Sequence, residues 1–199
     1  SSSRDAAALG RCTSNPQVNI GDNVAGHTAW VKGTTVRNYN DTYDSLPPTS
    51  GNVYGGGELA EVYGTAYVNM QNANSVIEGN IYGAGKGYTG DSIAANVSVD
   101  TYVNITDGTV KKNVYGGGEL ASVGTFGSAP GGGYTMTHGN THVTITGGFI
   151  GADANDHATE NDAFGNVYGA GYGYAGKSTI GRYTYSYAYY NYVGDANES

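Results

Sequence analysis

The fold of this chain is decided by the stretch Gly51-Asn52-Val53-Tyr54-Gly55-Gly56-Gly57, a heptapeptide pattern that returns three more times. The later copies are GNIYGAG at residues 79–85, KNVYGGG at 112–118 and GNVYGAG at 165–171. Recurrence of one motif is typical of repeat architectures, in which each supersecondary unit packs on the next. The chain is therefore predicted to contain four copies of one unit.

A short stretch of alternating apolar and polar residues precedes each heptapeptide, which predicts a strand with one buried face. The four stretches are Val18-Asn19-Ile20, Val68-Asn69-Met70, Val103-Asn104-Ile105 and Val143-Thr144-Ile145. A further apolar residue follows each of them, at Val24, Ile77, Val110 and Ile150. We expect copies near residues 15–57, 64–85, 98–118 and 140–171, all within one β domain covering residues 1–199.

Alternation assigns side chains to two faces of the predicted strands. Ala66, Val68 and Met70 are expected to point inward, together with the equivalent residues of the later copies, Thr101, Val103, Ile105, Thr141, Val143 and Ile145. The outward positions are Tyr67, Asn69, Tyr102, Asn104, His142 and Thr144. No single copy can bury its own apolar stripe, so successive copies must stack in register, about 4.8 Å apart. The predicted fold is all-β, a repeat β-solenoid resembling a parallel β-helix.

The glycine triplets and the spacers complete this prediction. Gly-rich segments are expected at tight corners, where positive φ or close approach of backbones excludes a side chain. The copies differ in length because loops are inserted, at residues 27–50, 124–133 and 151–164. A tyrosine-rich strand is expected at residues 182–193.

Composition supports the all-β class and excludes some functions. The chain has 34 Gly and 19 Tyr among 199 residues, only 13% charged residues, and a net charge of −8. An acidic chain lacks the basic footprint that nucleic-acid binding needs. No apolar run approaches the roughly 18 residues of a membrane-spanning helix. We expect neither nucleic-acid binding nor membrane spanning. The lone Cys12 is predicted to be a small, partly buried residue, with a reactive or intermolecular thiol as the alternative.

The residues after the glycine triplets alternate in charge from copy to copy. Glu58 follows the first triplet, Lys86 the second and Glu119 the third. If the copies stack in register, Lys86 lies between two carboxylates. Opposite charges on neighbouring strands are stabilising. We predict a Glu–Lys–Glu ladder, the alternative being three unconnected surface charges.

The segments Thr141 to Gly148 (THVTITGG) and Gly51 to Gly57 resemble the long Gly-rich "V-Y-G-G-G" repeat proteins of gut bacteria. The resemblance covers roughly residues 15–175. It implies a secreted or surface-attached bacterial protein with an adhesin-like role, and it carries over no catalytic residue.

Some segments match chemical motifs. Residues 171–178 (GYGYAGKS) satisfy the P-loop pattern, but the residues that follow are strand formers, whereas phosphate binding there needs a helix. The insertion around residue 156 concentrates oxygen ligands of the kind that Ca²⁺ prefers. A calcium site is one interpretation, and a solvated acidic loop is the other; the candidate ligands are Asp153, Asn155, Asp156, Glu160 and Asp162.

No constellation of residues points to catalysis. The histidines, at 27, 138, 142 and 157, are predicted to be ordinary polar residues, because His138 and His142 on one strand would lie about 13 Å apart. The carboxylates have no recognisable acid–base spacing; they are Asp44, Glu61, Glu78, Asp91, Asp100 and Asp107. We therefore expect a protein that is not an enzyme.

Three functional hypotheses remain, of which a polysaccharide-active β-helix enzyme is the least favoured. The first is a structural or adhesive extracellular protein that, as the subunit of a filament, would self-associate head to tail. The second is a module that binds a glycan or a host protein through an exposed face of Tyr67, Tyr102, Asn69 and Asn104. The series Tyr54, Tyr82, Tyr115 and Tyr168 forms another possible ladder, whose rings are expected to stack on one another.

Overall fold

The computed structural model describes residues 10–33, 51–88, 93–128, 134–137, 139–151, 164–180 and 183–189. These residues contain strands and no helix, as predicted. The strands are β1 (Gln17–Ile20), β2 (Trp30–Val31), β3 (Val53–Tyr54), β4 (Ala66–Met70), β5 (Val76–Ile77), β6 (Ile81–Tyr82), β7 (Thr101–Ile105), β8 (Thr109–Val110), β9 (Val114–Tyr115), β10 (Thr125–Ser128), β11 (Tyr134–Thr137), β12 (Thr141–Ile145), β13 (Phe149–Ile150), β14 (Val167–Tyr168), β15 (Tyr174–Ile180) and β16 (Tyr183–Tyr189).

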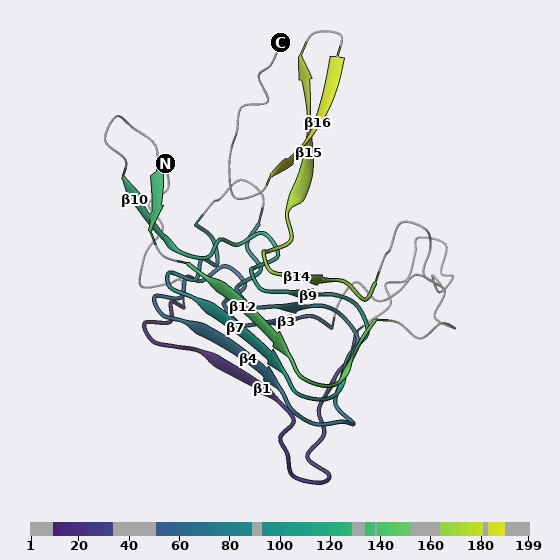
Figure 1. Cartoon of the computed structure of the whole chain (residues 1–199). Coiled ribbons are helices and arrows are strands. Elements are labelled where there is room, and N and C mark those ends of the chain that lie inside the picture. Colours follow the sequence, from purple (N-terminus) through teal and green to yellow (C-terminus); the bar gives the residue numbers. More distant parts are fainter. Residues whose placement is uncertain are drawn as a thin grey trace.

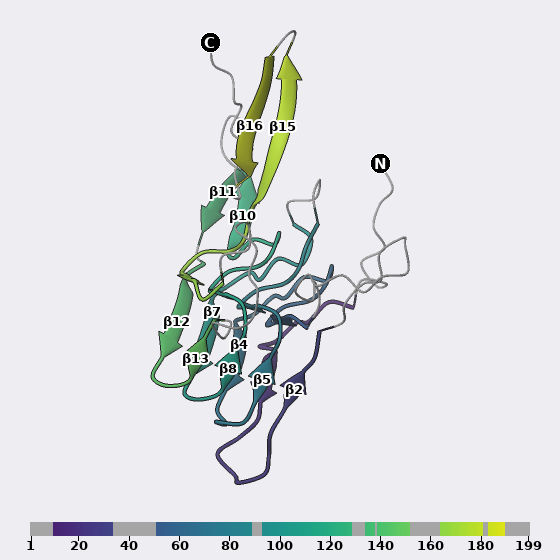
Figure 2. The same ribbon diagram turned by 90° about the vertical axis from the view of Figure 1, so that its right-hand side faces the viewer.

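Three parallel sheets of four strands each form the body of the molecule, in the orders β1-β4-β7-β12, β13-β8-β5-β2 and β14-β9-β6-β3. Each repeat copy therefore contributes one strand to every sheet. We call such a set of three strands a coil: coil 1 is β1–β3, coil 2 is β4–β6, coil 3 is β7–β9 and coil 4 is β12–β14. Figures 1 and 2 show the coils lying one above another. This arrangement is consistent with the predicted β-solenoid.

Equivalent residues of successive coils pair without any shift of register. Val18 is opposite Val68, Val68 is opposite Val103, and Val103 is opposite Val143. The third sheet repeats this, with Tyr54 beside Tyr82 and Tyr82 beside Tyr115. The prediction of in-register stacking is confirmed. Side chains at equivalent positions consequently form columns that run along the stack.

The inward residues of the strands make one apolar core shared between coils. Val68, Met70, Val103 and Ile105 are fully buried, and they pack in a cluster with the apolar residues of the other two sheets. Burial of one such side chain stabilises a fold by about 1.5–3 kcal/mol. No coil contains enough of these residues for a core of its own, so the stacking itself creates the hydrophobic interior.

One part of the predicted repeat is wrong. Val24 was expected to be the counterpart of Ile77, but it is exposed, and Val31 of β2 pairs with Ile77 instead. Trp30, predicted to belong to an insertion, lies in the same strand, opposite Val76. The turn after β1 is longer than in the later coils, so the nearest apolar residue in sequence is not the one that reaches the sheet.

Close packing of backbones, rather than positive φ, explains the glycine triplets. A Cβ on Gly55 would lie nearer than 3.0 Å to the carbonyl oxygen of Gly83, and a Cβ on Gly83 would meet Gly116 in the same way. Neither residue has a positive φ. Positive φ occurs instead at the turn glycines Gly51 and Gly165, at the starts of two heptapeptides.

Two antiparallel hairpins leave the stack (Figure 1). β10 and β11 connect coil 3 to coil 4, and β15 and β16 follow coil 4. The residues that matched a P-loop thus continue into a strand, β15, and the tyrosine-rich strand is observed as β16. Nothing in the part of the chain that the structure describes is a helix long and apolar enough to cross a membrane.

Candidate functional site

The tyrosine column, formed by Tyr54, Tyr82, Tyr115 and Tyr168, runs along the third sheet. Its ring centroids are 5.0, 4.9 and 4.9 Å apart, and successive rings are within 9° of parallel. Tyr172 adds an edge-on contact to Tyr115 at 5.8 Å. Neighbouring rings of this series stack face to face on one another, as predicted. Stacked pairs of this kind stabilise a protein by about 0.5–1.5 kcal/mol each beyond area burial.

Burial makes three phenols of this column, those of Tyr54, Tyr82 and Tyr115, harder to ionise. It raises the pKa of the Tyr115 hydroxyl to about 12. The pKa values of Tyr54 and Tyr82 are raised as well, first by burial; the carboxylate of Glu119 adds to both effects. The neutral phenol is favoured because an ionised one would be held away from water and beside a negative charge.

A second column lies on the outer face of the first sheet. The rings of Tyr67 and Tyr102 stack at 5.2 Å, and Tyr102 stacks on His142 at 4.4 Å. The prediction that Tyr67 and Tyr102 lie side by side is confirmed. Sugars bind to open aromatic faces, but Tyr102 has a ring stacked on each of its faces and Tyr67 has one face against Tyr102.

Asparagines form a hydrogen-bonded ladder beside these rings. The Asn69 amide donates to the Asn19 side-chain oxygen at 3.0 Å, and the Asn104 amide donates to that of Asn69 at 2.9 Å. Asn69 faces outward but is only 9% exposed, because its neighbours cover it. The four residues predicted as a binding face are therefore together on one surface, where they contact one another.

The predicted Glu–Lys–Glu ladder is present in backbone register and half formed by side chains. Lys86 lies between Glu58 and Glu119 in the stack, and its ammonium is 2.9 Å from a Glu58 carboxylate oxygen. Glu119 instead accepts a hydrogen bond from the Tyr54 hydroxyl. The carboxylate of Glu58 raises the pKa of Lys86. The carboxylate of Glu119 therefore contacts the tyrosine column and not Lys86.

The described carboxylates that were considered for catalysis make structural contacts. Glu61 pairs with Arg11 at 2.8 Å. Glu78 accepts hydrogen bonds from the Trp30 indole and a backbone amide, and Asp100 accepts one from the Asn140 amide. Asp107 accepts a hydrogen bond from the Gly108 amide. Asp44 and Asp91 lie outside the described residues.

The described histidines and Cys12 also have local partners. His27 is 2.9 Å from Asp22, whose pKa is lowered mainly by that hydrogen bond. Cys12 is partly buried, as predicted, and packs against a small apolar cluster around Val62 and Val97. His138 and His157 are outside the described residues.

The candidate calcium ligands also fall outside the described residues: Asp153, Asn155, Asp156, Glu160 and Asp162. In the ranges that the structure does describe, no group of three or more His, Cys, Asp or Glu side chains could hold a metal ion. A calcium site in this loop therefore stays a prediction.

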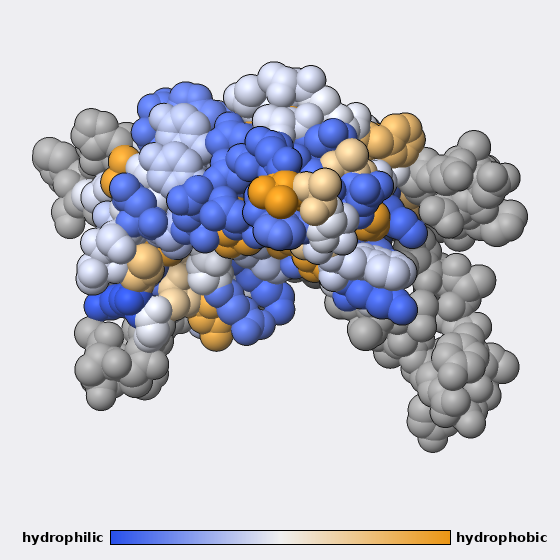
Figure 3. Space-filling model, turned by 90° about the horizontal axis from the view of Figure 1, so that it is seen from below, coloured by the Kyte–Doolittle hydropathy of each residue, from blue (hydrophilic) through white to orange (hydrophobic). Residues whose placement is uncertain are grey.

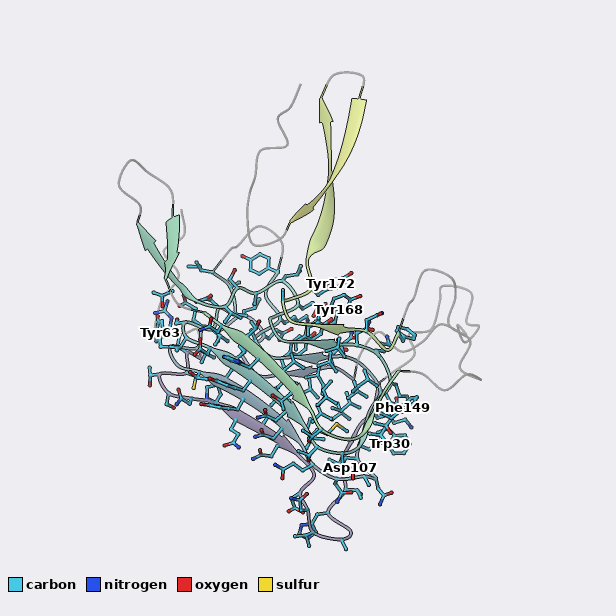
Figure 4. All side chains as sticks on the ribbon, in the orientation of Figure 1. Trp30, Tyr63, Asp107, Phe149, Tyr168 and Tyr172 are labelled. Atoms are coloured by element: carbon cyan, nitrogen blue, oxygen red, sulfur yellow. The ribbon has the colours of Figure 1, made fainter. Side chains whose placement is uncertain are left out.

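The outer side of coil 4 is an open end of the stack in the described residues, of the kind that the head-to-tail hypothesis requires. Val167, Ile145 and Phe149 of coil 4 are 46%, 38% and 54% exposed, whereas Val114 and Ile105 of coil 3 are fully buried. We call the outer side of coil 4 the C-terminal face and that of coil 1 the N-terminal face. Figure 4 shows Tyr168 and Tyr172 at the top of the third sheet and Phe149 at another corner.

The N-terminal face differs in character. Ile20 and Val53 of coil 1 are already buried, while Trp30 is 63% exposed. Figure 3 views the molecule from the side on which β1 lies, where the described surface is mostly hydrophilic with scattered hydrophobic residues. Within the described residues the strand edges are unpaired at both faces, as the head-to-tail hypothesis expects, and exposed apolar groups lie mainly at the C-terminal face.

No protein-family model, curated protein or solved structure matches this chain.

Proposed function

We propose that this chain is a β-solenoid that acts as a structural or adhesive element outside a bacterial cell, and not as an enzyme. The observation that carries the proposal is the continuity of the columns. Aromatic, amide and charged side chains that a binding or catalytic site would turn towards a ligand are turned towards their equivalents in the next coil. Such contacts stiffen a repeat stack along its axis.

The resemblance to Gly-rich "V-Y-G-G-G" repeat proteins supports the location. Secreted and surface proteins of this kind need rigidity and tolerance of inserted loops more than a preformed cavity. The variable insertions between constant strands fit such a role, because each insertion adds surface without disturbing the columns.

Two measurements test this proposal. Antibody labelling of intact cells that produce the protein should show it at the surface, and binding of labelled purified protein to host-cell glycoprotein layers tests adhesion. If the protein is found only inside the cell, the proposal is wrong.

The glycan-binding alternative is tested separately. A glycan array would need to give a hit that Tyr67→Ala weakens and Tyr172→Ala does not. Because three of the four ring faces of Tyr67 and Tyr102 are stacked against other rings, we expect no such hit.

A further inference from the structure

Gly169 is a glycine that nothing in the described part of its chain requires. Gly55, Gly83 and Gly116 occupy the equivalent position in coils 1 to 3, and a Cβ on any of them would lie nearer than 3.0 Å to a glycine carbonyl oxygen of the next coil. A Cβ on Gly169 would meet nothing within 4 Å. The position carries the residue that close stacking demands, yet no coil lies on it.

The third-sheet edge of the C-terminal face, beside the β15–β16 hairpin that rises from the same end of the stack (Figure 1), has backbone donors placed for a further coil. The amides of Val114 and Gly116 donate to carbonyl oxygens of coil 4, at 3.0 and 2.9 Å. The equivalent amides of coil 4 belong to Val167 and Gly169, and they point away from coil 3 because the strands are parallel and in register. Unpaired edges of this kind are templates for pairing with another chain.

The N-terminal face offers the matching acceptors. Val53 and Gly55 donate to the carbonyl oxygens of Asn80 and Tyr82 in coil 2. By the same register, the equivalent carbonyls of Asn52 and Tyr54 point away from coil 2. In the third sheet, one end of the stack thus presents backbone donors where the other end presents acceptors, and in the second sheet the polarity is reversed, because Thr109 and Phe149 donate to the coil below them.

We propose that the C-terminal face binds the N-terminal face of a second copy of this chain, with β14 pairing in parallel with β3 of that copy. Val167 would then be opposite Val53, and Tyr168 would stack on Tyr54, continuing the tyrosine column. The Gly55 carbonyl of the second copy would fill the space beside Gly169. This inference rests on the proposed solenoid. It adds which molecule binds the C-terminal face and in which register the strands pair.

Side chains are compatible with this register. Tyr172 would be next to Glu58 of the second copy, so no two carboxylates face each other in the charged column. Phe149 would meet Trp30 of the second copy, joining two exposed aromatic residues in the second sheet. Apolar side chains that coil 4 leaves in water would become buried, which is the main driving force for such an association.

The contact is heterologous, so it does not close on itself and leads to filaments. Two copies, each with a net charge of −8, repel one another at low ionic strength. Assembly should therefore strengthen as salt is raised to about 0.15 M or above, where charges more than about 8 Å apart are largely screened.

The test is sedimentation velocity of the full chain over a range of concentrations, with the single tryptophan, Trp30, as a fluorescent reporter. We expect wild type to associate and its tryptophan emission to shift to shorter wavelength as Trp30 becomes buried. Gly169→Ala should weaken association by about 10-fold or more, which corresponds to about 1.4 kcal/mol. At low protein concentration the melting temperature of Gly169→Ala should equal that of wild type, since a Cβ at this position meets nothing within 4 Å in the monomer.

Two controls separate the possible failures. Val99→Ala alters an exposed apolar residue that directly precedes β7 and belongs to neither coil 1 nor coil 4, and it should associate like wild type. Gly116→Ala tests the stack itself, because its Cβ would clash inside the chain. If Gly116→Ala melts like wild type, the proposed solenoid is wrong.

Other results would overturn the assembly alone. A monomer at all concentrations, combined with a destabilised Gly116→Ala, would show that the coils stack but the C-terminal face does not bind a second copy. Association that Gly169→Ala abolishes while Trp30 emission stays constant would mean that two C-terminal faces meet. Either outcome rejects the head-to-tail register.

Discussion

Replacing Gly83 by alanine tests the close stacking of the coils. Gly83 lies in the middle of the glycine column, and an added Cβ would come nearer than 3.0 Å to the carbonyl oxygen of Gly116. The obstacle is backbone, so no side-chain rotation can relieve the clash. Coils 2 and 3 would have to separate locally.

The cost follows from the contacts that separation would disturb. The Gly83 amide donates to Tyr115 at 2.9 Å and the Ile81 amide donates to Asn113 at 3.0 Å. Weakening two such hydrogen bonds costs about 1–3 kcal/mol, and overpacking a core costs about 1–3 kcal/mol. We expect a total near 3 kcal/mol. In a chain of this size that lowers the melting temperature by about 6–12 °C.

The assay is thermal unfolding followed by far-ultraviolet circular dichroism at low protein concentration. Gly169→Ala is the matched control, since it introduces the same methyl at the equivalent position of coil 4, where nothing lies within 4 Å. The control should melt with wild type. A Gly83→Ala protein that also melts with wild type would show that the coils are not packed as closely as described, and the explanation of the glycine triplets would fail.

Three further changes, in pH, in the asparagine ladder and in the exposed ion pair, are expected to alter the stability of the fold. Raising pH should leave stability intact below about pH 10 and then reduce it. Above that pH the unfolded chain releases phenol protons that Tyr54, Tyr82 and Tyr115, whose pKa values are raised in the folded protein, still hold. Melting at several pH values should show a shallower loss of stability for Tyr82→Phe. Asn69→Ala leaves amide groups of the ladder without partners and should cost about 1–3 kcal/mol in denaturant unfolding, whereas Thr144→Ala, exposed at the end of the same column, should change stability by less than about 0.5 kcal/mol. Lys86→Ala removes an exposed ion pair and should cost less than about 1 kcal/mol; a larger loss would mean that the ladder contributes more than surface pairs do.

Much of the fold could be predicted because the repeat displays itself in local patterns. Alternation at Val103 and Ile105 identifies the buried face of a strand, and recurrence of the same pattern identifies its neighbours. The stacking of Tyr67 on Tyr102 follows directly from register. The prediction failed at Val24, where a longer turn displaced the strand to Trp30 and Val31, because the sequence distance from β1 does not fix where the chain returns to a sheet.

The sequence by itself determined the all-β class, the four copies and the identity of the columns. Periodicity is a local property that can be recognised from the order of the residues alone. Only the tertiary structure decided that Glu119 binds Tyr54 in preference to Lys86, and that Asn69 is covered while Ile145 is exposed. Those outcomes depend on what lies above and below a residue in the stack. Gly116 and Gly169 both follow Asn-Val-Tyr in the sequence, yet in the described structure a coil packs on Gly116 and none packs on Gly169.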